Sequence, residues 1–226
     1  MKHIIVAIDG PAASGKSTVS KIIADKLNFN YIDTGAMYRC ITLKMIRENI
    51  LLTEEEKIID LLNRTEISFK NIDDNQHVFL DGEDVSELIR KPNVNELVSP
   101  VSAIKIIREK LVDLQRKLGD TENVIMEGRD ITTVVFPNAE VKIYLDAKLE
   151  VRAERRYKEL IEKGNDVTYE EILESVSKRD KNDMEKEFGA LKIADGAIYI
   201  DSTDLTPEEV FEKIKEVAYE KGKKNI

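Results

Sequence analysis

The sequence predicts an α/β protein with a doubly wound parallel sheet, because strand-like and helix-like segments alternate along the chain. Residues 3–8 and 141–145 are short runs rich in Val and Ile, which is typical of strands buried on both faces. A glycine-bounded turn follows the first run, and a helical pattern follows the turn at residues 16–27. Alternating β and α units of this kind form parallel sheets covered by helices.

The other elements of the sheet and its helices follow in order. We expect further strands at residues 29–32, 124–126 and 197–200, and helices at residues 35–48, 103–118, 148–163, 168–184 and 207–221. The last helix has a clear start, with Thr206 as N-cap, Pro207 in the first position and two acidic residues next.

Residues 66–85 interrupt this rhythm. Ile67, Phe69, Val78 and Leu80 alternate with polar residues, and residues 71–76 and 81–82 have the composition of turns. We therefore predict a small antiparallel sheet inserted into the α/β core; the alternative is a surface hairpin without a role. The polar stretch at residues 158–166 is either a short mobile cover for a site or a connecting loop.

Composition limits the class of protein. The 226 residues are 42% hydrophobic, enough for one substantial core. A net charge of −9 argues against a large nucleic-acid footprint, and no apolar run approaches the ~18 residues of a membrane helix. Cys40 has no cysteine partner, and the first ten residues lack the features of a signal peptide. We expect a cytoplasmic protein that binds neither nucleic acid nor membrane.

The strongest motif is the octet at residues 10–17, which fits G-x-x-x-x-G-K-[ST] between a predicted strand and a predicted helix. Its glycines let backbone N–H groups surround phosphate oxygens. Lys16 adds charge at the β- and γ-phosphates, and the Ser17 hydroxyl can bind Mg²⁺. The predicted ATP-binding residues are Gly10, Pro11, Ala12, Ala13, Ser14, Gly15, Lys16, Ser17 and Thr18.

Arginines stand at two further strand ends, where ligands bind in doubly wound sheets. Arg39 follows the second predicted strand, and Arg129 follows the strand at residues 124–126. We expect both to point toward a site beside the P-loop. Arg152, Arg155 and Arg156 share one helical face, which is either a solvated face paired with nearby glutamates or a set of charge neutralisers for phosphoryl transfer.

His3 and His77 are the two histidines of the chain, and we expect neither to lie near the predicted phosphate site. A kinase that acts on an alcohol needs a base to accept the proton, whereas a phosphate monoester already carries about −1.5 to −2 charges. This favours a phosphate acceptor over a hydroxyl, although Asp130 remains a candidate base.

At its motifs the chain resembles the bacterial cytidylate kinases, a family of P-loop nucleoside monophosphate kinases. The resemblance covers essentially the whole chain and is carried by the P-loop together with the segments at residues 33–39, 80–85, 128–137, 141–147, 178–180, 194–197 and 201–203. Residues 128–137, GRDITTVVFP, are far more specific than the P-loop.

The resemblance implies transfer of the γ-phosphoryl group of ATP to CMP or dCMP with Mg²⁺, in pyrimidine metabolism. It implies that Thr34, Arg39 and Arg129 bind the CMP phosphate with Tyr38 nearby. Ser99, Arg108 and Asp130 would face cytosine, and Arg179 and Asp183 would hold the ribose. The catalytic residues would be Lys16, Arg129, Arg152, Arg155 and Arg156, and Ser17 would bind the metal.

The resemblance also implies a domain organisation, and the chain departs from the family pattern at three positions. A single P-loop kinase domain, residues 1–226, would have its core at residues 1–60, 95–156 and 168–226, a CMP-binding insert at 61–94 and a helical lid at 157–167. We expect a monomer. Lys186, Ala190 and Glu127 depart from the family pattern of Arg, Pro and Asp, so a bidentate contact at position 186 is in doubt.

Two other classes of function stay open at this stage. One is a kinase for a different small acceptor, such as UMP, shikimate or dephospho-coenzyme A. The other is a nucleotide-dependent switch or binding module, which would lack the second arginine-rich site.

Overall fold

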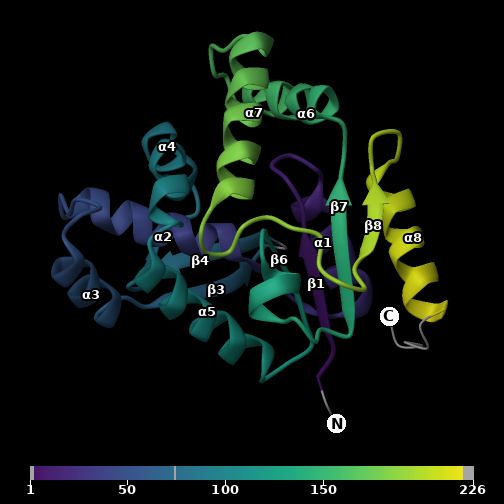
Figure 1. The fold of residues 1–226 in the computed structure, drawn as a ribbon, viewed down its shortest axis with the longest axis horizontal. Coiled ribbons are helices and arrows are strands. Elements are labelled where there is room, and N and C mark those ends of the chain that lie inside the picture. Colours follow the sequence, from purple (N-terminus) through teal and green to yellow (C-terminus); the bar gives the residue numbers. More distant parts are fainter. Residues whose placement is uncertain (1–2, 74, 221–226) are drawn as a thin grey trace. The chain divides into compact units, whose positions relative to one another are not determined.

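The computed structural model describes residues 3–73 and 75–220, and it confirms the predicted fold class. Five strands form one sheet in the order β2-β6-β1-β7-β8 (Figure 1). Their bounds are β1 Ile5–Asp9, β2 Asn30–Asp33, β6 Val124–Gly128, β7 Val141–Asp146 and β8 Ile198–Asp201. β1 pairs in parallel with both β6 and β7, and β7 pairs in parallel with β8. The carboxyl ends of β1, β6 and β7 therefore meet at one edge.

The contacts divide the chain into two compact units. Unit 1 consists of residues 1–31 and 118–226, and unit 2 consists of residues 32–117. The division by role into kinase core, CMP-binding insert and lid stays a prediction.

Unit 1 is built around the strands β1, β6, β7 and β8. Its helices are α1 Lys16–Leu27, α6 Leu149–Glu162, α7 Tyr169–Glu185 and α8 Pro207–Glu220, and a π-helical turn, η2, spans Ile131–Val135. In Figure 1, β7 leads directly into α6, which packs against α7.

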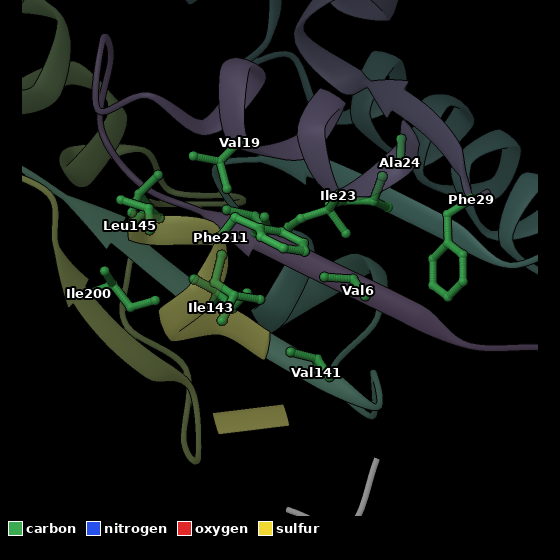
Figure 2. Packing of buried hydrophobic residues seen from close by; sticks show 14 residues of the cluster. Val6, Val19, Ile23, Ala24, Phe29, Val141, Ile143, Leu145, Ile200 and Phe211 are labelled. Atoms are coloured by element: carbon green, nitrogen blue, oxygen red, sulfur yellow. The ribbon is translucent and has the colours of Figure 1, made fainter. Parts of the chain in front are cut away.

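The core of unit 1 lies between the sheet and the pair α1 and α8. Figure 2 shows Val19 and Ile23 of α1 and Phe211 of α8 above Val6 and Ile143 of the sheet. All five side chains are at most 5% exposed. Val and Ile dominate the strands because branched side chains pack well on a pleated surface buried on both faces. This packing fixes β1 and α1, the two elements between which the P-loop runs.

Unit 2 combines helices with the inserted sheet. Its helices are α2 Thr34–Arg47, α3 Glu55–Asn63, α4 Pro92–Val101 and α5 Lys105–Gly119, with a short 3₁₀ turn, η1, at Leu88–Arg90. Its strands β3 Ile67–Ile72, β4 Asn75–Leu80 and β5 Glu83–Asp84 form an antiparallel sheet, as predicted. Val78 and Leu80 of β4 pack with Ala36 and Cys40 of α2 in a second buried cluster.

Two expectations for unit 2 were incomplete. The turn predicted at residues 71–76 is shorter than expected, because β3 and β4 continue their pairing through Asn71–Gln76 to Ile72–Asn75. α3 and α4 were not predicted. The core-facing Val94, Val98 and Val101 of α4 do have helical spacing, but Pro92 and Pro100 obscure that pattern in the sequence. Among the described residues, no helix is long and apolar enough to cross a membrane.

Candidate functional site

The P-loop connects β1 to α1 in a conformation that its sequence makes possible. Gly10 passes so close to β7 that a Cβ there would lie 2.0 Å from the Leu145 carbonyl oxygen, and Gly15 caps α1 with φ 96°. Ala13 also has a positive φ, 59°, which is rare for a residue with a side chain. The loop thus carries local strain that its surroundings must hold in place.

Lys16 is the first residue of α1 and is 5% exposed. Its Nζ donates to the Pro11 carbonyl oxygen at 2.6 Å and to Ser14 Oγ at 3.3 Å. Burial and, next, the positive charge of Arg129 lower the pKa of Lys16 to about 7, although nearby carboxylates raise it. A polyphosphate beside this ammonium group would restore its charge, because an opposite charge favours the protonated form. Ser17 and Thr18 follow it on the exposed side of α1.

Asp9, the last residue of β1, is fully buried and joins the P-loop strand to η2. Its carboxylate accepts hydrogen bonds from Ile131 N at 2.8 Å, Thr132 N at 2.7 Å and Thr132 Oγ1 at 2.6 Å. Burial raises the pKa of Asp9 to about 6, although the three hydrogen bonds favour its charged form. These bonds fix η2 directly after Arg129 and Asp130, so they orient the loop that begins with those two residues.

Arg129 and Arg179 meet Lys186 around a single carboxylate, Asp183. Asp183 accepts from Arg129 Nε at 2.8 Å and from Lys186 Nζ at 2.7 Å, and Arg179 Nε lies 3.8 Å from it. Burial alone would raise the pKa of Asp183, but the three cations outweigh it and hold the pKa well below its usual range. Among these four groups, three positive charges face one negative charge, an excess that the charges of Glu127 and Asp180 reduce.

The three arginines predicted as charge neutralisers have different partners. Arg152 donates to Asp180 Oδ2 at 2.5 Å and to the Ala12 carbonyl oxygen at 3.2 Å. Arg155 donates to the Ser202 oxygens, and Ser202 Oγ in turn donates to the Ser14 carbonyl oxygen.

Arg156 pairs with Glu159 one turn along α6. This pair is what the solvated-face alternative expects, but after burial and Arg129 the charge of Arg156 also lowers the pKa of Arg179, so its role as a charge neutraliser stays a prediction. The other two side chains contact the P-loop directly or through one residue.

In unit 2, the N-terminus of α2 carries a second group of predicted site residues. Asp33 caps the helix by accepting from Ala36 N at 3.0 Å, and Thr34 is buried beside it. A Cβ on Gly35 would lie 2.8 Å from Arg39 NH1, so glycine lets the guanidinium lie against the helix start. Burial would raise the pKa of Asp33, but the guanidiniums of Arg90 and Arg39 lower it. A helix N-terminus with an arginine over it suits an anion.

The residues expected to face cytosine within unit 2 also lie together. Arg108 of α5 is 6% exposed and its guanidinium lies 5.5 Å from the centre of the Tyr38 ring. Arg108 NH1 donates to the Ser102 carbonyl oxygen, and Ser102 Oγ donates to that of Ser99. Asp130, the third predicted residue, belongs to unit 1, where it is 4% exposed.

Sequence reasoning missed several residues that organise these groups. Asp9 and Asp180 hold backbone N–H groups of η2 and the P-loop, and Arg90 pairs with Asp33. In the sequence, the one signal for these residues was the position of Asp9, a carboxylate at the end of an apolar strand. Glu127 is buried and accepts from the Tyr31 hydroxyl at 2.5 Å. Within the described part of the chain, no group of three or more His, Cys, Asp or Glu residues forms a metal site.

Comparison with known proteins identifies the family. The chain is 51% identical over 226 residues to a cytidylate kinase of Caldicellulosiruptor bescii, with all of both chains covered. It is 54% identical over 221 residues to a cytidylate kinase of Caldanaerobacter subterraneus, covering 98% of this chain and 97% of the relative. An uncharacterized protein from Eubacterium ventriosum shares the fold, with a TM-score of 0.54 at 14% identity and coverage of 96% and 99%. The family model for cytidylate kinase matches residues 6–220, and the chain belongs to the cytidylate kinase family.

Proposed function

We propose that this chain transfers the γ-phosphoryl group of ATP to CMP or dCMP, giving ADP and CDP or dCDP. One observation carries the proposal. The P-loop with its buried Lys16 and the cation cluster of Arg129, Arg179 and Lys186 belong to the same compact unit. A phosphate loop alone serves many classes of protein, whereas a second cluster of cations is what a phosphorylated acceptor requires.

The ATP phosphates bind at residues 10–18 in this proposal. The loop amides and the N-terminus of α1 offer hydrogen-bond donors, and Lys16 offers a charge. Ser17 presents an exposed hydroxyl beside Lys16, an oxygen ligand of the kind that Mg²⁺ prefers. Mg²⁺ held by Ser17 and the ATP phosphates would neutralise charge on the transferring group.

The residues assigned to the acceptor phosphate are Arg129, Thr34 and Arg39. The cations around Asp183 and the arginine over the start of α2 both support this assignment. Arg179 and Asp183 hold the ribose, whose hydroxyl groups can donate to a carboxylate. Lys186 replaces the arginine of the family pattern, and it contributes charge through a single ammonium group.

Cytosine is bound by Ser99, Arg108 and Asp130. Its N4 amino group donates to a carboxylate or hydroxyl, and its O2 and N3 accept from a guanidinium. Uracil has an acceptor at position 4 and a donor at position 3, the reverse of cytosine. Binding uracil would therefore leave buried polar atoms without hydrogen bonds, and each such atom would cost about 1–3 kcal/mol of binding free energy. CMP should therefore be preferred over UMP.

The transfer itself consists mainly of positioning and charge neutralisation. The acceptor phosphate oxygen attacks the γ-phosphorus in line with the departing ADP. Lys16 and Arg129 stabilise the equatorial oxygens, and the α6 arginines Arg152, Arg155 and Arg156 support them from the lid side. Closure of residues 157–167 would exclude water and suppress ATP hydrolysis. The protein works as a cytoplasmic monomer.

The test is an ADP-release assay with CMP, dCMP, UMP and AMP offered in parallel, and with shikimate and dephospho-coenzyme A as acceptors of other chemistry. We expect ADP to form with CMP and dCMP and much more slowly with UMP. ADP release that is independent of CMP would contradict the proposal and favour a nucleotide-dependent switch.

Arg129→Ala tests the acceptor site. We expect kcat/KM for CMP to fall by about 100-fold, because a guanidinium aimed at the transferring charge is lost. Binding of a non-hydrolysable ATP analogue, measured by calorimetry, should stay within about twofold. Lys213→Ala, which removes an exposed cation from α8, is the matched control and should change neither quantity. An unchanged rate with CMP would rule out this acceptor-site assignment.

A further inference from the structure

Ala12, in the middle of the P-loop, is held on both sides of its backbone by two side chains. Its N–H donates to Asp180 Oδ1 at 3.3 Å, and its carbonyl oxygen accepts from Arg152 NH1 at 3.2 Å. Asp180 belongs to α7 and Arg152 to α6. We call Asp180 and Arg152 the Ala12 clamp.

The two side chains of the Ala12 clamp also hold each other. Arg152 NH1 lies 2.5 Å from Asp180 Oδ2, and the residues are 6% and 7% exposed. Arg152 Nε donates to the Ala147 carbonyl oxygen, at the end of β7, at 2.8 Å. The pair therefore joins the P-loop, the carboxyl end of β7 and both helices that flank residues 163–168. Charged groups buried to this degree have one well-defined geometry, because each is expensive to leave without its partner.

The next residue shows why the loop needs such a clamp. Ala13 has a φ of 59°, a left-handed conformation that L-residues with a Cβ adopt at a cost in energy. Conformations of this kind persist only where the surroundings over-determine them. The Ala12 clamp fixes the peptide groups on either side of Ala12, the second of which leads directly into Ala13.

We propose that Asp180 and Arg152 are positioning residues that set the shape of the phosphate loop for ATP and tie it to the orientation of α6 and α7. In this arrangement Arg152 acts on ATP through the Ala12 backbone. The loop shape governs how the amides meet the ATP phosphates, whereas CMP binds to other residues. Loss of the clamp should therefore weaken ATP binding and spare CMP binding. This inference rests on the proposed function only where the KM values are measured, because those need the kinase reaction with CMP.

The test compares Asp180→Ala and Asp180→Asn with Glu174→Ala, which removes an exposed carboxylate from the same helix. For Asp180→Ala we expect the KM for ATP, and the Kd of a non-hydrolysable ATP analogue, to rise about tenfold, the size of effect that a lost hydrogen bond to a charged group produces. The KM for CMP should stay within about twofold. Asp180→Asn, which keeps an oxygen for the Ala12 N–H, should recover part of the loss, and Glu174→Ala should behave as the wild type.

Arg152→Ala and the double variant complete a thermodynamic cycle. If the two side chains act as one clamp, the double variant should bind the analogue about as weakly as either single variant. If the fold-increase in the analogue Kd of the double variant equals the product of the two single fold-increases, the two side chains do not act as one clamp. An unchanged analogue Kd in Asp180→Ala would overturn the positioning role. Circular dichroism and urea unfolding separate these outcomes from misfolding. The analogue titration needs no turnover, so a wild-type chain inactive on CMP would contradict the proposed function and leave the clamp result standing.

Discussion

Asp183 and Asp9 are both buried carboxylates of unit 1, and their neighbours shift their pKa values in opposite directions. Asp183 touches three cations, so its pKa lies well below the usual range despite burial. Asp9 accepts three hydrogen bonds but forms no ion pair with a described residue, so burial dominates and raises its pKa to about 6. The number of opposite charges within contact decides which effect wins.

Asp183→Asn should lower the free energy of unfolding at pH 7 by about 2–3 kcal/mol, because three cations lose their common counter-charge. A carboxyl whose pKa is lower in the folded protein than the ordinary 3.8 stabilises the fold above that value, and the contribution is lost as the pH falls toward the folded-state pKa. The difference between wild type and variant should therefore be constant from pH 5 to pH 8 and shrink below pH 4. Urea unfolding at each pH measures it. A difference that grew on acidification would contradict the ion-pair assignment.

At the scale of elements, two helices of unit 1, α7 and α8, begin with side-chain caps that the sequence indicates. Thr206 Oγ1 accepts from Glu209 N at 3.2 Å, and Glu209 Oε2 accepts from Thr206 N at 2.8 Å, as in the predicted helix start. Thr168 and Glu171 form the same reciprocal pair before α7. Caps satisfy N–H groups that a helix cannot satisfy by itself. Such local signals explain why α7 and α8 lie within a residue or two of their predicted bounds.

Thr206→Ala should destabilise the protein by ~1 kcal/mol, the usual value of a helix N-cap. The loss should appear in urea unfolding, because Val210, Phe211 and Ile214 of α8 belong to the core of unit 1. Ser175→Ala, on the exposed side of α7, is the control and should change the free energy of unfolding by less than ~0.5 kcal/mol. An equal effect of the two substitutions would show that the cap contributes nothing.

At the scale of the whole molecule, each compact unit has its own buried cluster and its own group of predicted binding residues. The P-loop, Arg129 and Asp183 belong to unit 1, and Thr34, Arg39 and Arg108 belong to unit 2. A ligand that binds only the folded P-loop should therefore stabilise unit 1 by mass action.

A non-hydrolysable ATP analogue at 100 times its Kd should raise the free energy of unfolding of unit 1 by ~2.7 kcal/mol. Hydrogen exchange of the buried amides of β1 and β6 measures this, because such amides exchange only when the unit opens. In Lys16→Ala the same analogue concentration should give a much smaller rise. Equal protection in wild type and variant would exclude the P-loop as the binding site.

The sequence by itself determined the alternating β and α units, the P-loop, the inserted antiparallel sheet and the family, because these follow from local periodicity, turn chemistry and contiguous motifs. It placed the P-loop after β1 and Arg129 after β6, since parallel strands have their carboxyl ends at one edge of the sheet. It did not yield α4, whose prolines conceal a helical valine pattern, or the full length of β3 and β4, whose polar ends extend by backbone pairing alone.

Only the tertiary structure decided how the charged groups combine. Asp9, Asp180 and Asp183 bind partners 122, 168 and 54 residues away, respectively, and no periodicity in the sequence encodes such separations. The same holds for the three α6 arginines, which look equivalent in the sequence. In the fold one pairs with a carboxylate of α7, one donates to Ser202 and one pairs with a carboxylate of α6 itself. A side chain's charge is local information, but its partner depends on which elements the core packing brings together.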